Sequence, residues 1–268
     1  MDTNQFGKIS HLHLTSSVKD GKTILSDVSF TAPYKIMRPF EQKDGSIKVM
    51  LLAASAGIME GDRQKFKFNI QTGSNIEFTS QSYDKIHQMI SGCAKRHTEI
   101  KVAKHAHFCF NPQPTIPFAD SAFENTMHIE LADDSSAFQM VEIFSCGRYI
   151  RGEKFMYRYY HNFVKIYRQG KLIYRDNTRY NPDEFELAGM GMYEGFTHLA
   201  NIFITKPANA PDFAKQAYEL LQHAENITGG ITSLSSGDFA IRIFGHRAQI
   251  LEQLTKQIFA LLLKEAIN

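Results

Sequence analysis

The sequence predicts a mainly β protein with two α-helices in its C-terminal quarter. From Arg63 to about Arg175, apolar and polar residues alternate with the two-residue period of strands that bury one face. Turn residues interrupt this pattern every eight to twelve residues, and no helix of crossover length separates consecutive strands, which disfavours βαβ units. The period becomes that of an amphipathic helix only near the C-terminus.

The expected strands share this alternation. They are Lys65–Ile70, Ile76–Phe78, Thr98–Val102, Met127–Leu131, Phe138–Phe144, Phe155–Tyr160, Phe163–Tyr167 and Leu172–Tyr174. Residues 133–136, Gly147 and the pair Gln169-Gly170 supply turn chemistry between some of them. A sandwich, a barrel and a stacked β-helix are all compatible with this spacing.

The two expected helices lie on either side of one expected strand. Residues 211–226 place apolar side chains at helical spacing, begin with Pro211 and end near Gly229 and Gly230. Residues 246–264 carry a stripe of Ile and Leu opposite polar side chains, which predicts the second helix. Residues 239–244 predict the strand between them, so we expect the chain to end as α-β-α within a single domain spanning residues 1–268.

Composition excludes several classes of partner. With 30 Lys and Arg against 28 Asp and Glu, the net charge of +2 does not predict nucleic-acid binding. The longest apolar runs have six residues, where a bilayer span needs about 20. The polar segment Met1–Ser10 lacks the pattern of a secretory signal, so we expect a cytoplasmic protein without a membrane partner. Cys93, Cys109 and Cys146 show no paired spacing, which predicts reduced thiols.

Common catalytic motifs are absent from the sequence. It contains no His-Glu-x-x-His, no Gly-x-Ser-x-Gly and no Gly-x-x-x-x-Gly-Lys-Ser/Thr pattern. The nearest glycine-rich loop, Gly57–Asp62, carries carboxylates and no phosphate-binding lysine. We therefore expect a tight turn in which Gly61 has a positive φ and Asp62 accepts hydrogen bonds from nearby backbone N–H groups.

Three metal-capable residues, His105, His107 and Cys109, alternate along an expected strand and would share one face. Phe108 and Phe110 would then face the core, which places the three residues on a solvated surface and favours a structural interpretation over a metal site. His11 and His13 form a similar pair for which the structural interpretation is stronger.

Charged residues gather between Glu142 and Phe155. Arg148 and Arg151 could form bidentate pairs with Glu142 or Glu153 and so lock a turn. Alternatively, a carboxylate in this segment could meet a cation or a charged group of a partner.

Four segments in order resemble the family of urease accessory proteins called UreD, known as UreH in Helicobacter. They are the loop 57–62, the Thr-x-Gln-x-x-x-Lys stretch 79–85, the proline-rich segment 111–118, and the Glu-x-x-x-x-Gly-Arg-x-x-Arg-Gly-Glu signature 142–153. Residues 34–37 and 191–198 look closest to the Helicobacter branch. The loop departs from the family pattern in one respect, because Glu60 precedes Gly61 where members often have a second glycine.

The resemblance implies a β-helix-like stack of many strands with two helices and no catalytic activity. It also implies a maturation factor that binds UreF, through it the nickel-carrying GTPase UreG, and apo-urease, in a heteromeric complex that is a dimer of heteromers. No cofactor would be tightly bound. Ni²⁺ would be cargo in transit through water-filled passages lined by polar and acidic residues, on its way to the urease active site.

A nickel passage needs ligands that replace part of the hydration shell without trapping the ion, and single carboxylates meet that requirement. We therefore expect Asp62, Glu142 and Glu153 to line it, with Arg148 and Arg151 fixing the carboxylates. The same carboxylates would do no more than lock turns under the structural interpretation. We expect the C-terminal helices and residues 191–198 to contact partners.

Two other functions remain open. A β-helical enzyme acting on polysaccharide could use Glu142 and Glu153 as acid and base, although the absence of tryptophan disfavours sugar binding. A nickel store could use His105, His107 and Cys109 as a tight site.

Overall fold

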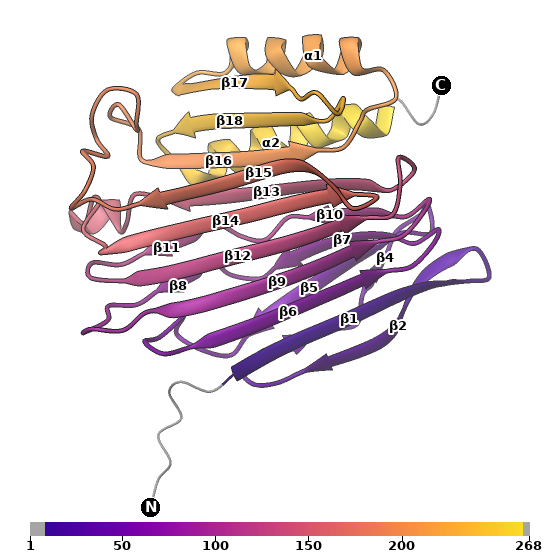
Figure 1. The fold of residues 1–268 in the computed structure, drawn as a ribbon, viewed down its shortest axis with the longest axis horizontal. Coiled ribbons are helices and arrows are strands. Elements are labelled where there is room, and N and C mark those ends of the chain that lie inside the picture. The colour runs from indigo at the N-terminus through magenta and orange to yellow at the C-terminus, as the bar shows by residue number, and fades with distance from the viewer. Residues whose placement is uncertain (1–8, 265–268) are drawn as a thin grey trace, which may run out of the picture.

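The computed structural model describes residues 9–264, with side chains through residue 262, and it consists of two stacked β-sheets with two helices at one end (Figure 1). The segment Met1–Ser10, from which a cytoplasmic location was expected, lies almost entirely outside the described residues. Neither described helix is long and apolar enough to cross a membrane. The predicted class, mainly β with two helices in the C-terminal quarter, is confirmed.

The first sheet has seven strands in the order β15-β14-β12-β9-β6-β1-β2. Their bounds are β1 Ile9–Lys19, β2 Lys22–Phe30, β6 Arg63–Ile70, β9 Ala94–Val102, β12 Ala122–Leu131, β14 Tyr159–Arg168 and β15 Lys171–Tyr180. Strands β1, β6, β9, β12 and β14 pair in parallel, and antiparallel β2 and β15 close the two edges.

The second sheet has eleven strands, and its main path runs β17-β18-β16-β13-β10-β7-β5-β3. Their bounds are β3 Tyr34–Ile36, β4 Phe40–Glu41, β5 Ile47–Ala53, β7 Asn75–Ser80, β8 Asp84–Ile86, β10 His107–Phe110, β11 Thr115–Pro117, β13 Ala137–Ser145, β16 His198–Ile204, β17 Ile227–Ser233 and β18 Phe239–Gly245. Strands β5, β7, β10 and β13 pair in parallel, whereas β13, β16, β18 and β17 are antiparallel.

From β5 to β14 the chain returns to the first sheet after every one or two strands of the second, so that inward-facing residues of neighbouring strands lie in line. Phe68 pairs in register with Ile100, which pairs with Ile129, and Ile76 pairs with Phe108 on the second sheet. These apolar residues are fully buried in one core between the sheets. The two-residue period of the sequence is therefore the period of core contact.

A second core lies between the second sheet and the helices α1 (Ala210–His223) and α2 (Ala248–Lys264). Phe213 of α1 and Leu251 and Ile258 of α2 are fully buried against this sheet. Each such side chain contributes about 1.5–3 kcal/mol through burial. Helix α1 begins after Asn209, whose side chain accepts a hydrogen bond from the Asp212 N–H.

Two expected details of the secondary structure are wrong. The chain ends as α-β-β-α, because Gly229 and Gly230 belong to strand β17 and do not end a helix. A Cβ atom at Gly229 would lie 2.8 Å from the Arg242 carbonyl oxygen, so glycine permits the close approach of β17 to β18. The expected strand Phe155–Tyr160 is irregular before Tyr159, because Phe155 has a φ of +54° and its N–H bonds to the Cys146 carbonyl.

Candidate functional site

A row of buried and half-buried polar side chains crosses the first sheet on its inward face. Gln64, Arg96, Asn125 and Asn162 pair in register on β6, β9, β12 and β14, and we call them the inner polar row. Each lies two positions before a buried, inward-facing residue of its strand. Sequence reasoning missed all four. In each of these four strands, a polar residue occupies a position that the two-residue alternation assigns to the buried face, and this pattern could have indicated the row.

Glu142 reaches the inner polar row from the opposite sheet. Its Oε1 accepts a hydrogen bond from Asn125 Nδ2 at 2.8 Å, and its Oε2 accepts one from Asn162 Nδ2, also at 2.8 Å. Burial raises the pKa of Glu142 to about 7, although the bonds from the two amides oppose the shift. This half-buried carboxyl group can therefore exchange a proton, or accept a cation, close to neutral pH.

Arg96 occupies the other half of the row. Its Nε donates to Gln64 Oε1 at 2.8 Å, and its Nη1 donates to Asp84 Oδ2 at 2.6 Å. The guanidinium carbon lies 5.0 Å from the centre of the Phe66 ring and 5.7 Å from that of Phe123. Burial alone would lower the pKa of Arg96, but the charge of Asp84 raises it, so the pair is held as an ion pair within the fold.

The Asp84 end of the row opens into a cavity of about 830 Å³, whose lining includes Tyr34, Asp62, Gln64 and Asp84. Asp62 lies in the expected turn: its Oδ2 accepts the Met59 N–H at 2.8 Å. Gly61 has the expected positive φ, +81°. Asp62 therefore lines the same cavity as Gln64, the first residue of the inner polar row.

Polar groups continue beyond Glu142 toward β18. Asn201 on β16 pairs in register with both Glu142 and Arg242, and Arg242 Nη2 lies 3.3 Å from Asp176 Oδ2. The side-chain oxygen atoms of Asn125 and Asn201 are buried and have no hydrogen-bond partner in the described part of the chain. Such unpaired acceptors are suited to bind water or a cation.

Glu153 lies outside the row, in the turn after β13. Arg148 Nε donates to Glu153 Oε2 at 2.7 Å, a second contact joins Arg148 Nη2 to Oε1, and the Ala119 N–H donates to Oε2 at 3.1 Å. The bonds from Arg148 lower the pKa of Glu153, and the charge of the exposed Arg151 adds a small effect. Of the two expected carboxylate partners, Arg148 therefore pairs with Glu153 and not with Glu142.

His107 and Cys109 share one face of β10, opposite the core residues Phe108 and Phe110 as expected, but His105 lies outside this strand. His105 lies in a turn with a φ of +54°, before β10 begins. The ring of His107 contacts Asn75 Oδ1 at 2.7 Å and Gln139 Oε1 at 3.3 Å. Cys109 is buried in the core beneath the helices, so the expected solvated surface is wrong, and burial raises its thiol pKa to about 12. No cluster of three His, Cys, Asp or Glu suited to a metal ion occurs among residues 9–262.

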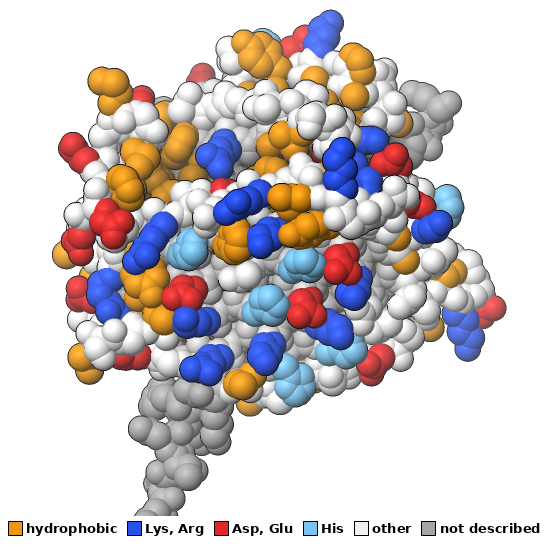
Figure 2. Space-filling view, in the orientation of Figure 1, with side chains coloured by type: hydrophobic (Ala, Val, Ile, Leu, Met, Phe, Trp, Pro, Cys, Tyr) orange, Lys and Arg blue, Asp and Glu red, His pale blue; other side chains and the backbone are white. Residues whose placement is uncertain are grey.

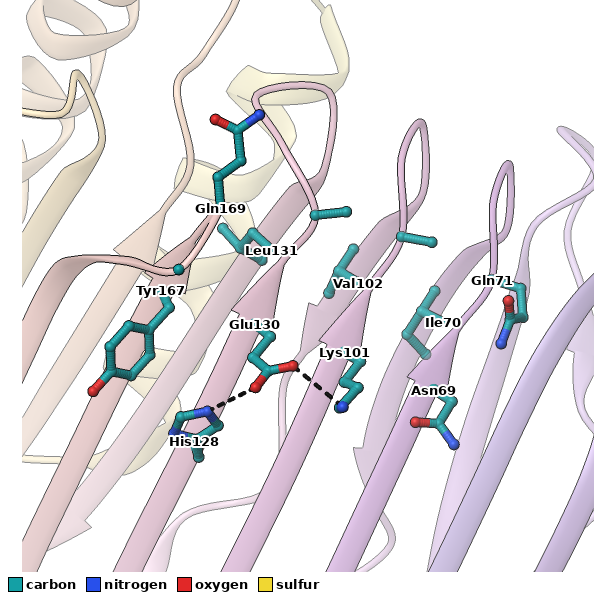
Figure 3. A pocket seen from close by; sticks show the side chains of 13 residues that line it. Asn69, Ile70, Gln71, Lys101, Val102, His128, Glu130, Leu131, Tyr167 and Gln169 are labelled. Atoms are coloured by element: carbon teal, nitrogen blue, oxygen red, sulfur yellow. Dashed lines mark hydrogen bonds and ion pairs between the residues drawn. The ribbon is translucent and has the colours of Figure 1, made fainter.

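A hollow of about 710 Å³ lies on the outer face of the first sheet, near the turns that follow β6, β9, β12 and β14 (Figure 3). Glu130 is one of the residues that line this hollow. Its Oε1 lies 3.1 Å from His128 Nε2, and its Oε2 lies 3.3 Å from Lys101 Nζ. Its charged groups therefore pair with one another.

Comparison with known proteins shows relatives over nearly the whole chain. The family model described as UreD urease accessory protein matches residues 8–268. Urease accessory protein UreD of Acetivibrio thermocellus is 38% identical over 256 residues, which cover 95% of this chain and 97% of that protein. Urease accessory protein UreH of Helicobacter pylori J99 is 33% identical and covers 95% of both chains. Urease accessory protein UreD of Flavobacterium johnsoniae is 29% identical over 253 residues, which cover 93% and 91%.

Proposed function

The chain belongs to the UreD family of urease accessory proteins, and we propose that within this role it is a non-catalytic scaffold that passes Ni²⁺ toward apo-urease. Its partners are UreF, through it the nickel-carrying GTPase UreG, and the urease apoenzyme. The assembly is cytoplasmic and is a dimer of heteromers. Nickel is the cargo of this complex and not a resident cofactor of the chain.

The inner polar row with Glu142 is the observation that carries this proposal. Two amide side chains and one carboxylate meet between the sheets, and the nearby cavity places Asp62 at one end of the row. An ion that moves between single carboxylates and amide oxygens exchanges part of its hydration shell at each step without meeting a closed site. Sites with several His or Cys ligands would hold Ni²⁺ too tightly for rapid transfer.

Arg96 places a positive charge along the proposed nickel path. A lone guanidinium between the sheets would repel a divalent cation, but Asp84 at 2.6 Å neutralises it. Asp62 and Glu142 then provide negative charge on either side of this ion pair. We expect Asp62 and Glu142 to meet nickel, while Glu153 keeps the turn after β13 in place through Arg148.

Partner binding is assigned to two surfaces. A groove of about 480 Å³ between α1 and α2 is lined in part by Leu220, Ile250 and Leu254, and suits an apolar segment of UreF. In the loop before β16, Met190 is 94% exposed, whereas Tyr193 is buried in the core and holds the loop in place. The loop therefore offers a partner an exposed apolar side chain in a fixed position.

Reconstitution tests this proposal. Apo-urease, Ni²⁺, bicarbonate, GTP and the other accessory proteins are combined with and without this chain, and urease activity is measured. We expect activation to require the chain, and Glu142→Gln to reduce the activation rate while gel filtration still shows the assembled complex. Glu77→Gln is the matched control, because Glu77 pairs with Lys48 on the far side of the second sheet.

Two results would contradict parts of the proposal. Equal activation with and without the chain would remove the scaffold role. Wild-type rates for Glu142→Gln would remove the inner polar row from the nickel path and leave the scaffold role intact.

A further inference from the structure

The outer face of the first sheet carries excess positive charge (Figure 2). The outward cationic residues of β6, β9, β14 and β15 are Arg63, Lys65, Lys67, Lys95, Lys101, Lys165, Arg175 and Arg179. The outward carboxylates of the same sheet are Asp27, Glu99, Glu124 and Glu130. The whole chain has a net charge of only +2, so positive charge is concentrated on this face.

The four carboxylates are already engaged by their own neighbours. Glu124 pairs with Lys95 at 2.7 Å and Glu130 with Lys101 at 3.3 Å. Glu99 lies 3.2 Å from His97, and Asp27 lies 3.5 Å from His13. The outward cations of β14 and β15, Lys165, Arg175 and Arg179, have no ion-pair partner in the described part of the chain.

These cations lie over half-buried aromatic rings. Lys165 Nζ lies 4.6 Å, and the Arg175 guanidinium carbon 5.5 Å, from the centre of the Phe163 ring. The Arg179 guanidinium carbon lies 4.7 Å from the centre of the Tyr159 ring. Together with His161, which pairs in register with Arg179, these residues form what we call the cationic strip.

The like charges of the cationic strip destabilise the hairpin formed by β14 and β15. Lys165 and Arg175 pair directly across the antiparallel strands β14 and β15, and like charges in that position are destabilising. The ring of Phe163 beneath both cations reduces the repulsion but does not neutralise it. A cluster of like charges without counterions is better explained by binding to a negative partner than by folding.

We propose that the cationic strip binds a segment rich in Asp and Glu on a partner protein. An arginine over a ring has no carboxylate partner there and can offer its N–H groups for bidentate bonds to a carboxylate. Single-stranded nucleic acid is the less suitable ligand, because it needs free ring faces for base stacking and these rings are already covered by cations. This surface is independent of the inner polar row and of nickel.

Binding of a defined peptide to the full chain tests this site. The probe is fluorescein-labelled deca-glutamate, measured by fluorescence anisotropy at low salt, with labelled deca-glutamine and a ten-nucleotide oligo-thymidine as comparisons. The strip variant is Arg175→Gln with Arg179→Gln. The control variant, Lys65→Gln with Lys67→Gln, removes the same charge from exposed positions of the same sheet that have no aromatic support.

We expect the strip variant to weaken deca-glutamate binding about tenfold or more, and the control variant to weaken it less than about threefold. The strip variant should also unfold at an equal or higher temperature than the wild type, because a like-charge pair is relieved. The proposal is overturned if the wild-type chain does not bind deca-glutamate, if both variants weaken binding equally, or if oligo-thymidine binds more tightly than the peptide.

Discussion

Glu142 on β13 and Asn162 on β14 are joined across the space between the two sheets by a hydrogen bond of 2.8 Å from Nδ2 to Oε2. The same carboxyl group also accepts a bond from Asn125 of β12, so one acidic side chain ties three strands together. Burial makes the charged form of this group costly, and its pKa rises to about 7.

The raised pKa predicts a pH-dependent stability. A carboxyl group with a higher pKa in the folded chain than in the unfolded chain binds its proton more tightly when folded. The free energy of unfolding should therefore fall as the pH rises from about 4.5, the ordinary value, to about 7. In Glu142→Gln, residue 142 cannot ionise. Between pH 5 and pH 8 the free energy of unfolding of the wild type should therefore fall by about 2–3 kcal/mol relative to that of the variant.

Urea denaturation at pH 5, 6, 7 and 8 measures this difference. Parallel stability curves for the two proteins would show that Glu142 does not carry a raised pKa in the folded chain.

A buried ion pair joins the end of β14 to the start of β18. Asp238 is fully buried, and its carboxylate accepts bonds from Arg168 at 2.6 Å and 3.1 Å and from the Lys206 N–H at 3.0 Å. Asp238→Asn leaves the Arg168 cation with only the exposed carboxylate of Asp134, whose Oδ1 lies 3.4 Å from Nε, so we expect a loss of about 3–5 kcal/mol in the free energy of unfolding. Glu130→Gln, which breaks an exposed pair with Lys101, should cost less than about 1 kcal/mol. Similar costs for the two variants in urea denaturation would contradict this assignment.

Local patterns predicted the apolar parts of the fold well, because the two-residue period and the helical stripe reflect contact with a core. The second helix was expected over residues 246–264 and is observed over Ala248–Lys264. The strands expected to start at Lys65, Thr98 and Met127 start earlier, because each continues through a residue of the inner polar row. A polar residue on the buried face of a strand interrupts the apolar alternation in the sequence, although the strand itself continues.

The partners within the site could not be predicted from sequence spacing. Glu142 was expected as a functional residue, but Asn125 and Asn162 lie 17 and 20 residues away in the chain and belong to the other sheet. They meet Glu142 only because successive strands alternate between sheets with a fixed register. By contrast, Arg148 and Glu153 are five residues apart, and local sequence indicated Glu153 as one of two candidate partners of Arg148.

The Glu60 side chain binds the backbone of a neighbouring loop. Its Oε2 accepts the Ile90 N–H at 2.8 Å, and its Oε1 accepts the Ser91 N–H at 3.1 Å and the Gly92 N–H. These bonds hold the pKa of Glu60 below its usual value, so they persist above the ordinary carboxyl pKa and are lost as the pH falls through the folded value.

Glu60→Ala should therefore accelerate hydrogen exchange at the amides of residues 90–92 at neutral pH, with little change in global stability. The same substitution at the exposed Glu225 is the control and should leave exchange in residues 90–92 unchanged. Unchanged protection of residues 90–92 in the Glu60 variant would contradict the anchoring role.

The turn after β13 contains two glycines that differ in the space around them. Gly147 has a φ of +130°, and a Cβ atom there would lie 2.5 Å from the Glu153 carbonyl oxygen. Gly152 has a φ of +80° and open space within 4 Å. Gly147→Ala must move the backbone that positions the Arg148–Glu153 pair, so we expect it to cost about 3 kcal/mol or more in urea denaturation. Gly152→Ala should cost only the left-handed penalty of about 1–2 kcal/mol. Equal costs would mean that the turn relaxes freely around Gly147, and Glu153 would then lose its role in fixing that turn.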